Sequence, residues 1–161
     1  MGTNVEQIYD VALITMNDYQ LDALARVDYD AFLKYLKGFL ISGLPEFTGD
    51  VLGELKIVPV EITDDEGNTK TQYEFTRELT SKEISILSKT FAYKWVLKTH
   101  QDLKLLRGHL GIKEFKQLEI SSGMKQRSEY LDKLKEDIQY DITQLQLSNL
   151  NTIKFFGELE D

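Results

Sequence analysis

The chain has 161 residues, of which 42% are hydrophobic and none is cysteine, and its formal net charge is −8. This length suits one domain that buries about two thirds of its unfolded surface, and the composition argues against a wholly disordered chain. The lack of cysteine excludes disulfides and cysteine-based zinc sites, while the acidic balance argues against a dedicated nucleic-acid reader. No apolar run has the length of a membrane span, so we expect a soluble protein.

The N-terminal part of the sequence indicates helices. The apolar run at residues 8–14 fits either a helix or a strand. Asn17 and Asp28 are candidate N-caps, because a side-chain oxygen there can accept from the backbone N–H groups of the first helical turn. Apolar residues after Asp28 recur at intervals of three and four, which predicts a helix. We expect Gly43 and Pro45 to end that helix.

A β-hairpin is predicted near residues 55–76. The segment Leu55–Ile62 is rich in β-branched residues, and Gln72–Thr76 alternates with the period of a strand. The polar cluster Asp64–Asn68 between them has the composition of a turn. Pro59 has no backbone N–H to donate, so its strand should lie at an edge. A two-stranded hairpin is only marginally stable alone, so it must rest on the helices or on a neighbouring subunit.

The helix that follows is expected to be central to the fold. Thr80 and Glu83 have the spacing of a capping box, in which each side chain accepts from the backbone N–H of the other. Apolar residues then recur at helical spacing and include Trp95, the only tryptophan. A helix that is apolar on much of its circumference is usually buried. We predict this helix from Ser81 to about Leu106, ended by Gly108.

A second long helix is predicted from about Met124 to Asn149, after a break at Ser121–Gly123. Its apolar residues have heptad-like intervals of three and four and form one seam. They are Leu131, Leu134, Ile138, Ile142 and Leu145. The expected fold class is therefore mainly α, a helical bundle with one β-hairpin and a C-terminal extension. We divide the chain into a helical domain, residues 1–150, and a tail, Asn151–Asp161.

The tail carries four apolar residues beyond the predicted end of the last helix. They are Ile153, Phe155, Phe156 and Leu159. They could fold back onto their own subunit, or they could dock onto a partner, where aromatic anchors are enriched.

Known catalytic patterns are missing from the sequence. His100 and His109 have no metal-binding partner at i+4, and there is no GxSxG, phosphate-binding loop or GxGxxG. The carboxylates of Asp64, Asp65 and Glu66 lack the spacing of a calcium loop, and a solvated turn explains them. We expect no enzyme activity, no metal and no cofactor.

Four stretches, in this order, resemble the small head–tail connector (adaptor) proteins of tailed bacteriophages. They are Ile8–Met16, Leu36–Leu44, Glu78–Ile84 and Ser128–Leu134. None is a catalytic signature, and the resemblance lies in their order and spacing. The hairpin region, Leu55–Phe75, is longer than the family pattern.

The resemblance implies a helical subunit that forms a ring, usually of twelve copies, beneath the portal protein in the neck of the virion. Such a ring extends the DNA channel and carries the next neck or tail protein, and DNA passes through without specific binding. The resemblance places portal or neighbour contacts at Ile153, Phe155, Phe156 and Leu159. It places tail-side contacts at the hairpin tip, which consists of Asp64, Asp65, Glu66, Gly67 and Asn68.

Two other readings remain open. A tail-completion or tail-terminator protein is a second structural possibility, although those proteins are generally richer in strand. A soluble helical protein-binding module or regulator, also without enzyme activity, is the alternative from another class. Self-association separates the classes, because a binding module should stay monomeric, whereas an adaptor should form rings, at least when portal is present.

Overall fold

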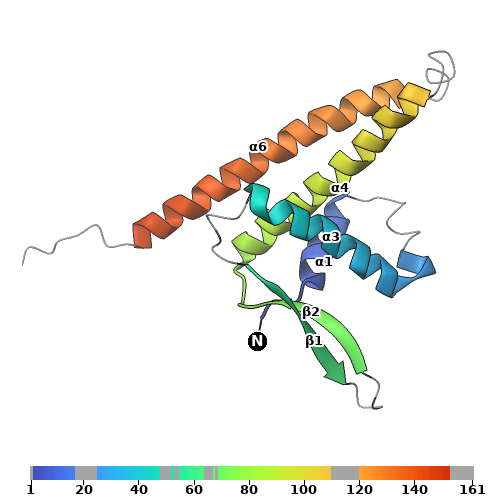
Figure 1. Ribbon diagram of the computed structural model, residues 1–161. Coiled ribbons are helices and arrows are strands. Elements are labelled where there is room, and N and C mark those ends of the chain that lie inside the picture. The colour runs from blue at the N-terminus through green and yellow to red at the C-terminus, as the bar shows by residue number, and fades with distance from the viewer. Residues whose placement is uncertain are drawn as a thin grey trace, which may run out of the picture.

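The computed structural model describes residues 2–16, 25–47, 52, 55–63, 67, 69–109 and 120–152. Six elements follow one another along the chain. They are α1 (Glu6–Met16), α3 (Tyr29–Phe47), β1 (Ile57–Thr63), β2 (Thr69–Phe75), α4 (Ser81–His109) and α6 (Ile120–Thr152). The two longest helices, α4 and α6, run in opposite directions, α1 and α3 pack on α4, and the hairpin extends from one end of this body (Figure 1). The predicted class, mainly α with one β-hairpin, is confirmed.

The first two helices begin at side-chain caps. The apolar run at residues 8–14 is helical and belongs to α1, where the Asn4 side chain accepts from the Glu6 backbone N–H at 2.9 Å. Asp28 caps α3 as predicted, since its side chain accepts from the Ala31 N–H at 3.0 Å. Asn17, the other predicted cap, lies outside the described residues.

The prediction that Gly43 and Pro45 end α3 is wrong, because the helix continues through both to Phe47. Pro45 lies in the last turn, where its missing N–H removes one helical hydrogen bond. Gly43 instead allows α3 to approach α4 closely. A Cβ added at Gly43 would lie 2.6 Å from the Cγ2 of Thr90 on α4. The glycine is therefore required by helix packing and does not end the helix.

The hairpin is confirmed, and its second strand has neighbours on both edges. β1 and β2 are antiparallel, with partners from Ile57 opposite Phe75 to Thr63 opposite Thr69. On the other edge of β2, Tyr73 accepts from the Val5 N–H at 3.0 Å, and Phe75 donates to Thr3 at 2.9 Å. The sequence did not predict this contribution of the N-terminal segment. Gly67, in the turn, has a φ of +85°, a conformation that glycine adopts without strain.

The capping box at the start of α4 is confirmed. Thr80 donates its backbone N–H to the Glu83 carboxylate at 2.7 Å, and Glu83 donates its N–H to the Thr80 hydroxyl at 3.3 Å. The guanidinium of Arg77 bonds the same carboxylate and also the carbonyl of Leu52 at 3.0 Å. The helix runs to His109 and so includes Gly108, which was expected to end it.

The main core surrounds α4, as predicted. Leu87 and Phe91 are fully buried and belong to one apolar cluster with Ile8 of α1 and Leu36 of α3. Trp95 is buried among aromatic rings, and the ring of Phe39 on α3 meets it edge-on with centroids 5.4 Å apart. Burial of this apolar surface from three helices is the principal term that stabilises the arrangement.

The seam of α6 is also confirmed, while the predicted ends of this helix are wrong. Leu131, Leu134 and Ile138 are buried in a second cluster with Ala92 and Tyr93 of α4, and Leu145 joins the main core. Ser121–Gly123 lies inside α6, and the helix continues beyond Asn149 to Thr152. Packing of the seam on α4 outweighs the weak helix propensity of serine, glycine and asparagine at its ends.

Candidate interaction surfaces

No metal-binding cluster of side chains is found within the described residues. Among them, no three His, Cys, Asp or Glu side chains come close enough together to hold a metal ion. His100 is buried, and its Nδ1 has no partner within the described part of the chain. Burial, followed by the charges of Lys104 and Arg127, lowers the pKa of His100, so the neutral imidazole is favoured. The side chain of His109 lies outside the described residues. The candidate functional features considered next are surfaces for interaction.

The residues predicted to contact partners fall mostly outside the described part. Of the hairpin tip, Gly67 alone is described, and it is exposed; Asp64, Asp65, Glu66 and Asn68 lie outside. The predicted anchors of the tail, Ile153, Phe155, Phe156 and Leu159, also lie outside, whereas Asn151 and Thr152 belong to α6. These assignments stay predictions.

The hairpin carries exposed apolar side chains away from the helices. Val58 and Ile62 of β1 are 38% and 42% exposed, although their residue types usually pack against neighbours. The two strands extend from the body at the end where α4 begins (Figure 1). Val58 and Ile62 lie four positions apart on the same strand. Because side chains alternate between the two faces of a strand, these two share a face. Their partners across the hairpin, Glu74 and Lys70, lie on the same face, so this face is a mixture of apolar and charged side chains.

A groove of about 400 Å³ lies between the hairpin and the first two helices. The groove is lined by Asn4, Glu6 and Tyr9 at the start of the chain, by Asp30, Leu33 and Lys34 of α3, and by Thr69–Tyr73 of β2. Its walls are apolar and charged in similar measure, with two carboxylates and two lysines. Mixed walls of this kind suit a polar chain with a few apolar side chains.

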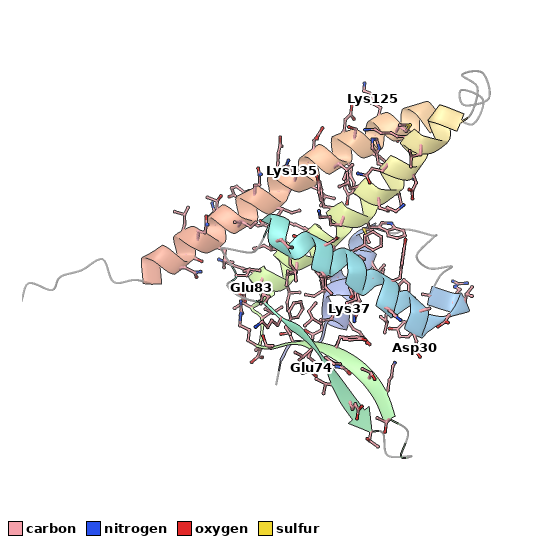
Figure 2. All side chains as sticks on the ribbon, in the orientation of Figure 1. Asp30, Lys37, Glu74, Glu83, Lys125 and Lys135 are labelled. Carbon is pink, nitrogen blue, oxygen red and sulfur yellow. The ribbon has the colours of Figure 1, made fainter. Side chains whose placement is uncertain are left out.

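Charged side chains stand over aromatic rings beside the groove. The ammonium of Lys37 lies 3.6 Å from the centroid of the Tyr73 ring, and that of Lys70 lies 5.3 Å from the Tyr29 ring. Asp30 and Lys37 both leave α3 on the side of the hairpin (Figure 2). These cation–π contacts are the side-chain links between the hairpin and α3 that border the groove.

Tyr9 lies in the wall of the groove and has an unsatisfied hydroxyl. The side chain is 3% exposed, packs against the ring of Phe91 with centroids 5.4 Å apart, and its hydroxyl has no hydrogen-bond partner among the described residues. Burial, and to a lesser extent the Glu6 carboxylate, raises the pKa of Tyr9. The phenol therefore stays protonated and can donate. A buried donor without an acceptor costs free energy.

The sequence alone did not reveal this groove. It exists because residues 3–5 pair with β2 and then turn into α1, which brings Asn4 and Glu6 beside Thr69–Tyr73. The sequence signal nearest to the groove is Asn4, because asparagine two residues before Glu6 is a typical N-cap at the start of a helix. Nothing in the sequence indicates which strand the residues before α1 pair with.

None of the helices within the described ranges has the length and apolarity needed to cross a membrane. Comparison with models of known protein families gives no match, and comparisons with curated proteins and with solved structures give none either.

Proposed function

We propose that this chain is a head–tail connector protein of a tailed bacteriophage, which forms a ring below the portal and extends the DNA channel towards the tail. The observation that carries the proposal is where the four connector-like stretches lie. Ile8–Met16 lies in α1, Leu36–Leu44 in α3, Glu78–Ile84 at the cap of α4 and Ser128–Leu134 in α6. The resemblance thus covers the helices that pack into one body and is not confined to one segment.

Exposed apolar residues on different sides of the body support a ring. On α6, Tyr140 and Leu147 are 64% and 48% exposed. On α1 and α3, Val11, Tyr35 and Ile41 are exposed as well. A contact between two different surfaces of identical subunits is heterologous, and it closes into a ring when the rotation between neighbours allows it.

In this role the contacts with other proteins are made by the tail and by the hairpin tip. Ile153, Phe155, Phe156 and Leu159 contact the portal or the neighbouring subunit, and the tip at Asp64–Asn68 contacts the next neck or tail protein. The net charge of −8 gives a channel wall that repels phosphate groups, so DNA slides without binding. The role is structural, requires no catalysis, and places the protein in the neck of the virion.

The test is assembly with a portal protein from the same genome. Co-sedimentation followed by electron microscopy should show rings of this chain at the narrow end of the portal. Removal of residues 153–161 should leave the thermal unfolding midpoint nearly unchanged and weaken sedimentation with portal. Wild-type chain that neither sediments with portal nor forms rings contradicts the proposal.

The groove favours a second candidate, a monomeric protein-binding module without enzyme activity. A groove with mixed walls is a feature that such a module needs. Sedimentation velocity over a wide range of concentrations separates the two candidates. A chain that stays monomeric throughout, both alone and with portal, supports the module and counts against the connector.

A further inference from the structure

His100 lies on the side of α4 that packs against α6. It follows Tyr93 by seven residues and Val96 by four, so the three share a face of the helix. Tyr93 belongs to the apolar cluster that includes Leu131 and Leu134 of α6, and Val96 packs against this cluster. α4 finishes beside the start of α6, far from the hairpin (Figure 1). His100 therefore extends the contact between the two helices towards this end.

The imidazole of His100 is buried without a hydrogen-bond partner at one nitrogen. The residue is 5% exposed, and its buried Nδ1 atom has no partner among the described residues. An imidazolium carries N–H donors at both ring nitrogens. Protonation therefore places a charged donor at a buried position that offers it no acceptor. This costs more free energy than leaving a neutral nitrogen unpaired.

The charges that act on His100 are positive. Lys104, one turn further along α4, and Arg127 of α6 both repel an added proton on the ring. Burial, followed by these two charges, holds the pKa of His100 below its ordinary value of about 6.5. The cations come from both helices of the contact, so the neutral imidazole is favoured while the helices stay packed.

Two carboxylates in the same part of the helices are paired with other lysines. Lys98 bonds Asp102 on α4, and Lys125 lies 3.8 Å from Glu129 on α6. Among the described residues, the charges that affect His100 are those of the two cations and not of a carboxylate. An imidazolium at this position therefore gains no compensating ion pair.

His100 differs in chemistry from the other buried residues of the described contact. Those residues are Ala92, Tyr93, Leu131, Leu134 and Ile138. None of them changes charge between about pH 5 and 8, the range in which histidine titrates. An apolar side chain at position 100 would fill the same space without a response to pH.

We propose that His100 is a pH-sensitive switch, at which protonation loosens the packing of α6 against the end of α4. The protonated ring favours an open state in which it reaches water, and Met124 and Leu131, which are buried in the packed state, become exposed. The switch uses contacts within one subunit, so it does not depend on the connector role.

The direction of the pH dependence follows from the environment of the ring. The packed state holds the proton of His100 less tightly than the open state. The stability that neutral His100 contributes is therefore complete above about pH 6.5, the pKa of an exposed histidine. It is lost as the pH falls through the lowered pKa of His100 in the packed state. Acidification opens this end of the helix pair, and a return to neutral pH closes it.

The first measurement follows the ring signals of the wild-type chain by NMR between about pH 5 and 8. The chain has two histidines, so the variant His109→Gln assigns the signals. His100 should titrate below about pH 6.5. Titration of His100 at or above this pH overturns the inference, and this result does not depend on any variant of His100.

Amide hydrogen exchange of the full chain locates the opening. After correction for the intrinsic exchange rate, protection near His100 and Leu131 should fall by up to about tenfold for each pH unit below pH 6.5, because opening takes up one proton. Amides near Leu87, in the main core, should keep their protection. A loss of protection that is uniform along α4 overturns the inference, as does protection that stays constant between pH values of about 7 and 5.

Full-length variants test whether His100 is the group responsible. His100→Leu and His100→Gln remove the titrating ring, so in both variants the acid-dependent loss of protection should disappear. His109→Gln, the matched control, should keep it. Arg127→Gln should weaken it, because one of the two repelling charges is gone, whereas Arg127→Lys should keep it. Persistence of the loss in both variants of His100, or its disappearance in His109→Gln, assigns the response to another group and overturns the inference.

Discussion

Two glycines of α3 have opposite surroundings, although both lie in the same helix. Gly43 is buried, and a Cβ there would meet Thr90, which is fully buried and donates its hydroxyl to the carbonyl of Ile86 at 2.8 Å. Thr90 is therefore held in place and cannot rotate away at low cost. A Cβ at Gly38 meets nothing within 4 Å. The local sequence around a glycine does not distinguish these situations, because the difference lies in the neighbouring helix.

Alanine at these two positions should change stability in opposite directions. Gly43→Ala is expected to lower the free energy of unfolding by about 1–3 kcal/mol, since the added methyl overpacks the contact with α4. Gly38→Ala should raise it by about 0.5–1 kcal/mol through better helix propensity. Urea unfolding measures both. Equal stabilisation by the two substitutions would show that α3 lies farther from α4 than described.

Glu83 provides a second prediction for a single residue, in this case as a function of pH. Its carboxylate is nearly buried and accepts from the Thr80 N–H and hydroxyl and from Arg77. Burial alone raises the pKa of Glu83, but the hydrogen bonds from Arg77 and Thr80 outweigh it, so the pKa lies below its ordinary value. Because the folded state binds the proton less tightly than the unfolded state, this contribution to stability is present above the unfolded pKa of about 4.3. It is lost as the pH falls through the lowered folded pKa.

Glu83→Gln should therefore cost about 1–3 kcal/mol of unfolding free energy at neutral pH. The difference from wild type should shrink below pH of about 4, where the wild-type carboxyl is protonated. Glu78→Gln, at an exposed position five residues earlier, is the control and should change little. Chemical denaturation at several pH values measures both. A deficit for Glu83→Gln that is the same at acid and neutral pH would contradict the role of the charged carboxylate.

At the scale of elements, the apolar seam of α6 stabilises this helix through its packing on α4. Ile138 is fully buried against α4, and Lys89 of α4 bonds Asp141 on the next turn at 2.6 Å. Leu147 is nearly half exposed on the same helix. Ile138→Ala is expected to lower the free energy of unfolding by about 2–5 kcal/mol through lost burial and a cavity. Leu147→Ala should cost less than about 1 kcal/mol.

Circular dichroism with denaturant titration of both variants checks this prediction. A similar loss for Ile138→Ala and Leu147→Ala would mean that α6 does not rest on α4 through the described seam. A loss confined to Ile138→Ala also leaves Leu147 available, as the proposed ring contact requires.

The elements that the sequence predicted well have local causes. The capping box needs only Thr80 and Glu83, and the seam of α6 needs only the spacing of its apolar residues. The ends of α3 and α6 were placed wrongly because local propensity suggested breaks at Gly43 and at Ser121–Gly123. At Gly43 the neighbouring α4 lies within packing distance, whereas a Cβ at Gly123 would meet nothing within 4 Å, so α6 runs through that glycine without such a contact there. The groove needs three segments together, residues 3–5, α3 and β2, so periodicity in any one of them could not indicate it.

At the scale of the whole molecule, the arrangement separates surfaces that serve different contacts. The hairpin strands and the C-terminal end of α6 leave the body near the start of α4 and point in different directions (Figure 1). Such a separation suits a subunit that contacts identical neighbours on both sides, since the two halves of a heterologous contact must be presented in different directions.

The net charge gives a last prediction, which concerns DNA. With a formal charge of −8, each subunit of a ring repels phosphate groups, so few counterions are released and little affinity is gained. We expect no sequence-specific binding to DNA and a dissociation constant no tighter than about 1 μM at moderate salt. Non-specific binding by other proteins is already weak under these conditions. A gel-shift titration with duplexes of unrelated sequence, run beside a basic DNA-binding protein as positive control, measures this. Sub-micromolar affinity for one duplex would indicate a nucleic-acid reader, because the channel wall of the proposed ring must bind DNA only weakly if DNA is to pass through it.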